Sequence, residues 1–166
     1  DVLERLALLL HTLVLQHQQG GEGEGHVDSL AESAVCWLFD LVVNVLTCRL
    51  RHILDVCMHA RLEGRPQGAS VHLPTHYVTH CGACVELLLL HQDTVVSVGD
   101  ASAQEVTSHA LIQKEETEAS VSGTAGGWRG MNNVRKCLQV ARKLVLAGHV
   151  HWEHVDRHQL DLHLNT

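Results

Sequence analysis

The sequence predicts a mainly α-helical protein with one minor β-hairpin, and three observations support this fold class. Leucine and valine recur at the helical spacings of three and four over much of the chain. Two clusters of glycine interrupt those patterns and separate the helical segments. Phenylalanine and tyrosine occur only once each, so the core is built almost wholly from leucine and valine. Such a core is expected to pack loosely or not to fold stably.

The first predicted element is a helix over residues 1–19, in which leucines recur every three or four positions from residue 2 onward. The glycines and glutamates of residues 20–27 predict a flexible acidic linker. Residues 28–166 are then expected to form a single, mostly helical domain, because a chain of 166 residues is long enough for one core and too short for two.

A long helix is predicted from Leu30 to about Leu62. Ser29 and Glu32 have the spacing of a capping box at its start, and Gly64 provides the stop signal just past its end. β-Branched residues near the middle of this segment weaken the helical pattern there.

Two short apolar runs, Val85–Leu90 and Thr94–Val98, predict the β-hairpin. The polar residues at positions 91–93 between them are typical of a turn. Ser102 and Glu105 form a second capping box, which predicts a separate polar helix after the hairpin.

The clearest amphipathic pattern predicts a helix over Asn133–Ala147, with Gly148 just past its end as a C-cap. The last segment, His149–Leu164, alternates in places and is not expected to add to the core. The apolar face of the predicted helix contains Val134, Cys137, Leu138, Ala141 and Leu144.

Composition also limits which partners the protein is expected to bind and which cellular compartment it is expected to occupy. The net charge of −7 argues against binding to nucleic acid or to acidic membranes. The longest apolar run, Val35–Leu46, is shorter than the roughly 20 residues that a membrane span needs. Residues 1–15 lack the basic start and the cleavage site of a secretory signal, and the six cysteines fit a reducing compartment. We therefore expect a cytoplasmic protein, and the initial Asp1 indicates a fragment, a processed product or an arbitrary frame start.

The strongest local candidate for a site contains His76, His80, Cys81 and Cys84. The two cysteines have C-x-x-C spacing, and Gly82-Ala83 is expected to form a tight turn that lets both thiolates bind one ion. Zinc prefers such nitrogen and sulfur ligands, so zinc is the one cofactor that these residues predict. No second pair lies at the distance usual for structural zinc sites. The hypothesis is a His/Cys metal-binding module, with no catalytic residue predicted.

A second histidine cluster, His149-Val150-His151-Trp152-Glu153-His154, resembles the H-x-H-x-D-H signature of the metallo-β-lactamase family. The resemblance implies that the three histidines are metal ligands. Glu153 stands where the family has aspartate, and few residues follow His154, whereas further ligands of the family lie far downstream of the motif.

The imbalance of residue types indicates how the reading frame arose. The chain has 15 histidines but three lysines, one phenylalanine and one tyrosine. On the complementary strand of a GC-rich gene, a valine codon GTG becomes the histidine codon CAC. Glutamate, glutamine and lysine codons become leucine, and aspartate and asparagine codons become valine. Translation of such a strand predicts a product rich in histidine, leucine and valine, as this chain is.

In this composition the chain resembles the antisense-type frames that carry the name NAD-specific glutamate dehydrogenase, for example over Leu50–Val56 and His149–Leu164. That resemblance implies an NAD-dependent oxidoreductase acting on glutamate. No dinucleotide fingerprint accompanies it, and Lys114, Lys136 and Lys143 do not suggest a glutamate site. The favoured hypothesis is a chain without an evolved function. The alternatives are the metal-binding module and, by resemblance only, the enzyme.

Overall fold

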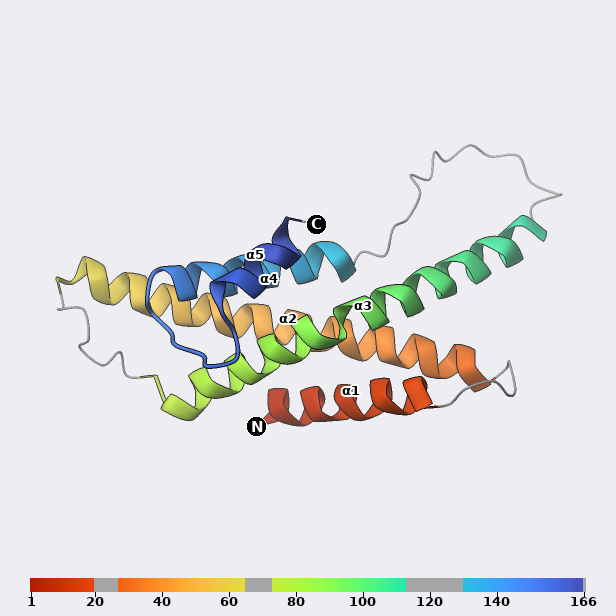
Figure 1. The fold of residues 1–166 in the computed structure, drawn as a ribbon, viewed down its shortest axis with the longest axis horizontal. Helices are drawn as coiled ribbons and strands as arrows, with labels where there is room; N and C mark the ends of the chain where they lie inside the picture. Colours follow the sequence, from red (N-terminus) through yellow and green to blue (C-terminus); the bar gives the residue numbers. More distant parts are fainter. Residues whose placement is uncertain (20–26, 65–72, 113–129, 166) are drawn as a thin grey trace.

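A computed structural model describes residues 1–19, 27–64, 73–112 and 130–165, and this part of the chain forms a bundle of α-helices (Figure 1). The central helix α2 contacts α1, α3 and α4, and the short α5 packs on α4. Successive long helices run in opposite directions along the bundle (Figure 1). The helices are α1 (Val2–Gln19), α2 (Val27–Leu62), α3 (Thr75–Ile112), α4 (Gly130–Leu146) and α5 (Arg157–Leu164).

Helix α1 forms where the leucine spacing predicts it. Its buried residues recur at intervals of four, three and four, which places them on one face toward the rest of the bundle. The linker predicted for residues 20–27 lies outside the described residues except for its last residue, which begins α2. The buried residues of α1 are Leu3, Ala7, Leu10 and Val14.

Helix α2 confirms the long helix predicted to end near Leu62, but it starts earlier than the capping box indicates. Because the helix begins at Val27, Ser29 lies inside its first turn instead of at the N-cap. Past the end of the helix, Gly64 has a φ of 69°, a left-handed conformation that glycine adopts without a steric penalty.

The predicted β-hairpin is wrong: Val85–Leu90 and Thr94–Val98 both belong to the single helix α3. The described residues contain no strand. The second capping box, at Ser102 and Glu105, likewise lies inside α3 and starts no separate helix. The buried residues of α3 follow helical spacing, and a buried histidine takes one apolar position of that stripe. The buried side chains are Cys81, Cys84, Val85, Leu88, His91 and Val95.

The C-terminal third confirms one prediction and corrects another. Helix α4 matches the predicted amphipathic helix, and Gly148 after it has a φ of 68°. The following segment, which was expected to stay out of the core, contributes four buried residues. Asp156 caps α5 by accepting a hydrogen bond from the backbone of Gln159. The buried residues of this segment are Val150, Trp152, Val155 and Leu160.

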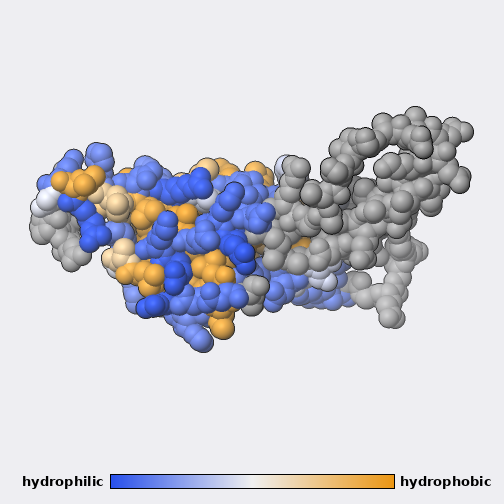
Figure 2. All heavy atoms as spheres, turned by 90° about the horizontal axis from the view of Figure 1, so that it is seen from above, coloured by the Kyte–Doolittle hydropathy of each residue, from blue (hydrophilic) through white to orange (hydrophobic). Residues whose placement is uncertain are grey.

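The buried residues form one continuous apolar cluster that reaches all the helices, with Phe39 fully buried. Loose packing of this core remains a prediction. At the surface, Trp37, Leu62 and Leu90 are among the exposed large apolar side chains. Figure 2 shows that apolar residues on one face of the molecule form separate patches among hydrophilic ones.

One described segment, Glu32–Leu62 of α2, is long and apolar enough to cross a membrane by length and composition. It is longer than Val35–Leu46, the apolar run on which the sequence-based expectation rested, and that run is itself interrupted by Asp40 and Asn44. Core helices of soluble proteins meet the same criterion, and α2 packs against α1, α3 and α4.

Candidate functional site

The four residues of the predicted metal site all lie on the first half of α3. The expected tight turn at Gly82-Ala83 is wrong, because both residues are helical. Without a turn, the two cysteine side chains point into the bundle. Cys81 is 0% exposed and Cys84 is 3% exposed. His76 is exposed and His80 is half-buried on the outer side. The structure therefore divides the predicted ligand set into two buried thiols and two accessible imidazoles.

Gly82 is required by packing and not by a turn. A Cβ atom at this position would lie 2.3 Å from Cδ1 of Trp152, well inside van der Waals contact. The missing side chain lets the indole ring lie against α3, where Trp152 Nε1 donates a hydrogen bond of 3.1 Å to the carbonyl of Val78. This contact holds the segment between α4 and α5 against the part of α3 that carries the two histidines.

The buried thiols have low reactivity. Burial raises the pKa of Cys81 to about 11 and that of Cys84 to about 12. Cys137 of α4 lies near them, and burial raises its pKa to about 11. Because the thiolate is the form that binds metal and attacks electrophiles, these protonated thiols behave at neutral pH as small apolar core residues.

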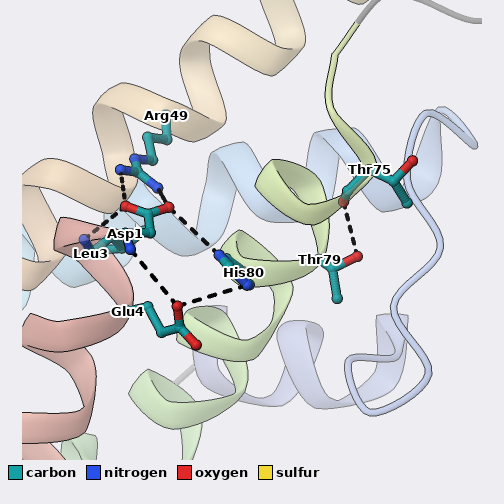
Figure 3. Close-up of polar contacts among 7 residues, drawn as sticks. All are labelled: Asp1, Leu3, Glu4, Arg49, Thr75, Thr79 and His80. Carbon is teal, nitrogen blue, oxygen red and sulfur yellow. Dashed lines mark hydrogen bonds and ion pairs between the residues drawn. The ribbon is translucent and has the colours of Figure 1, made fainter.

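His80 is part of a polar cluster that joins three helices (Figure 3). Arg49 of α2 donates two hydrogen bonds, of 2.5 and 2.6 Å, to the carboxylate of Asp1. The imidazole of His80 places Nδ1 at 3.5 Å from Asp1 Oδ2 and Nε2 at 3.9 Å from Glu4 Oε2. The ring of His76, one turn earlier on α3, has its centroid 6.0 Å from that of His80.

A second histidine pair lies between α1 and α3. Nδ1 of His11 and Nε2 of His91 are 2.7 Å apart, so one ring donates a hydrogen bond to the other. His91 is 3% exposed. Its pKa is lowered, first by burial and then by the neighbouring His11, because a second positive charge there would have little solvent to stabilise it. Burial therefore favours the neutral form of the His91 ring.

The cluster at positions 149–154 does not form a common site. Val150 and Trp152 are buried, while His151 and His154 are exposed. Burial lowers the pKa of His149, and the nearby Arg61 lowers it further. In the described part of the chain, no three His, Cys, Asp or Glu side chains lie close enough together to hold a metal ion as they stand.

Sequence analysis missed Arg49, Asp1 and Glu4 as neighbours of His80, and it missed the pairing of His11 with His91. These contacts join different helices, and no local sequence motif predicts them. The one local signal was the spacing of four between His76 and His80, which places two side chains on the same face of any helix. Comparison of the chain with protein-family models, with curated proteins and with solved structures found no match.

Proposed function

We propose that this chain is the product of an antisense-type reading frame and has no evolved catalytic or ligand-binding function. The observation that carries the proposal is its composition: 15 histidines beside three lysines, one phenylalanine and one tyrosine. Reading the complementary strand of a GC-rich gene accounts for the histidines and the missing aromatics together. A selected metal-binding function accounts only for the histidines.

A helical bundle is compatible with this origin. Complementing the central base of each codon exchanges apolar for polar residues and leaves their spacing unchanged. An amphipathic helix on one strand therefore remains amphipathic on the other, with its two faces exchanged. Helix α4 illustrates such a pattern, with Val134 and Leu138 buried while Arg135 and Lys136 are exposed. Helical periodicity alone is thus no argument for selection.

The proposal assigns no glutamate dehydrogenase activity to the chain. In a dehydrogenase site a lysine that binds or activates the substrate needs a recess that holds the substrate beside the cofactor. Lys136 and Lys143 are both exposed on the outer face of α4. Lys114, the third lysine, lies outside the described residues.

The test is targeted mass spectrometry of the source cells for the tryptic peptide Leu144–Arg157, with products of neighbouring genes as positive controls. We expect the controls to be detected and the peptide to be absent. A second measurement is translation of the opposite DNA strand, which should give one continuous protein of ordinary composition. Robust detection of the peptide, or an opposite strand interrupted by stops, would contradict the proposal.

A further inference from the structure

We propose that the hydrogen bond between His11 and His91 is a pH-sensitive latch, which holds the C-terminal half of α1 (residues 11–19) on α3 and opens when both rings are protonated. The result of opening is a local release of one half-helix from a bundle that otherwise stays folded. The inference concerns the folded chain, and it holds whether or not the reading frame is under selection.

The latch joins two helices through two groups that titrate. Nδ1 of His11 lies 2.7 Å from Nε2 of His91. His91 is 3% exposed and His11 is half-buried, so the bond is largely shielded from water. Such a bond needs one ring nitrogen that carries a proton and one that offers a lone pair. When both rings are protonated, neither nitrogen can accept a hydrogen bond, and two positive charges face each other.

The groups around a protonated His91 do not compensate its charge. Burial lowers the pKa of His91, and the charge of His11 lowers it further. Glu86 and Asp93 of α3 are exposed, and their helical positions place them on the side of α3 opposite to His91. Among the described residues, the titratable and charged groups of the other helices do not shift the pKa of His91. These groups include His17 on α1, Glu32 and Asp40 on α2, Arg135 and Lys136 on α4, and His163 on α5, which hydrogen-bonds with Gln92.

The two halves of α1 are held by different contacts. Three of the four buried residues of α1 lie in its first half, and Val14 is the one that lies past the latch. Arg49 of α2 fixes the start of the helix through two hydrogen bonds to Asp1. Gln18, in the second half, donates a 3.2 Å hydrogen bond to Thr94 of α3, but that bond is exposed and water competes for it. The latch is therefore the buried polar contact that secures the second half.

Acid favours the open latch because the open state binds more protons than the closed one. In water a histidine has a pKa of about 6.5, whereas the closed latch holds His91 with a lowered pKa. Uptake of one proton on opening raises the ratio of open to closed latch about tenfold between about pH 7.5 and about pH 5.5, and uptake of two raises it about 100-fold. A released segment as short as residues 11–19 does not stay helical by itself, so its amides lose their hydrogen bonds.

The experiment measures backbone amide hydrogen exchange of the full chain by nuclear magnetic resonance at about pH 7.5 and about pH 5.5. Protection factors, which correct for the effect of pH on intrinsic exchange, should fall at least about tenfold in acid for the amides of residues 13–19. Exchange of these amides should not respond to low urea concentrations, because the opening is local. Exchange of the Leu138 amide in α4 should accelerate with urea, because it requires global unfolding.

Three variants assign the effect to the latch. His91→Gln offers His11 both a donor and an acceptor but does not titrate, so the loss of protection in acid should fall below about threefold. His11→Gln, in which His91 still titrates, should keep only part of that loss. The control His17→Gln removes a histidine of α1 outside the latch and should keep all of it.

The inference is overturned if the protection of residues 13–19 is the same at both pH values, or if those amides share the urea dependence of Leu138. It is also overturned if His91→Gln loses protection in acid as the unmodified chain does; where that variant does not fold, His11→Gln takes its place. Neither result depends on whether the peptide is found in cells, so the two proposals fail separately.

Discussion

The two histidine pairs of this bundle contain the same side chains and have opposite properties. His76 and His80 lie on one face of α3, beside the carboxylates of Asp1 and Glu4. His11 and His91 lie between two helices, and His91 is 3% exposed. The first pair is open to solvent at His76, whereas burial lowers the pKa of His91 in the second pair. Location in the fold, and not residue type, therefore decides which histidines are accessible.

The two pairs should differ most in how a permanent positive charge changes the free energy of unfolding. His91→Lys buries an ammonium group next to His11 and should lower the free energy of unfolding by about 3–5 kcal/mol. His80→Lys places the same group beside two carboxylates and should change it by less than about 1 kcal/mol. Urea unfolding of both variants measures the two effects. Equal losses at the two positions would contradict the comparison.

The next largest change in the free energy of unfolding is expected at the contact between Gly82 and Trp152, which holds the segment between α4 and α5 against α3. Gly82→Ala should destabilise the protein by about 1–3 kcal/mol, because the added Cβ displaces the indole of Trp152. Helix propensity alone predicts the opposite sign, a gain of about 1 kcal/mol. The control is Ala83→Gly at the exposed neighbouring position, which should cost about 0.5–1 kcal/mol. A stabilised Gly82→Ala variant would show that the indole does not pack there.

Acid should destabilise the protein through the buried pair. The pKa of His91 in the folded state is lowered from its ordinary value of 6.5. The unfolded chain therefore binds the proton first, and the stabilisation is present above pH 6.5 and lost as the pH falls through the folded-state pKa. His149, whose pKa is also lowered, acts in the same direction.

His91→Leu should remove the contribution of the buried pair and leave that of His149. Chemical unfolding at a series of pH values measures the slope in both proteins, and the difference between the slopes isolates His91. Identical slopes in the two proteins would mean that His91 is accessible to protons in the folded state.

The smallest change in the free energy of unfolding is expected at the ion pair between Arg49 and Asp1. Arg49→Gln removes the two hydrogen bonds to Asp1 and should lower the free energy of unfolding by less than about 1 kcal/mol, as partly exposed ion pairs usually do. It should leave the acid sensitivity that His91 confers unaltered, because Arg49 does not contact that histidine pair. A large loss of stability in thermal unfolding would show that the cluster has a structural role instead.

The helices could be predicted where apolar residues kept an uninterrupted helical period, as in α1 and α4. The prediction failed over α3 because His91 occupies an apolar position of the stripe, and His91-Gln92-Asp93 therefore looked like a turn between two strands. The burial of Trp152 could not be predicted, because it depends on the absence of a side chain at Gly82, 70 positions earlier in the chain.

The candidate site was only partly accessible to sequence reasoning. The spacing of His76 and His80 places both on one face of a helix, but the sequence prediction had a tight turn at Gly82-Ala83 and no helix over this segment. The orientation of Cys81 and Cys84 into the core depended on where α4 lies, and the approach of Asp1 and Glu4 depended on the packing of α1 against α3. Local motifs contain no information about such long-range contacts.

The comparison is tested most directly by reaction of the folded chain with diethyl pyrocarbonate, which modifies accessible histidines, followed by tandem mass spectrometry of its peptides. We predict that His76, which is exposed, is modified rapidly, and that His91, which is 3% exposed, is protected until the chain unfolds. Equal rates of modification at the two histidines would contradict the claim that burial separates the two pairs.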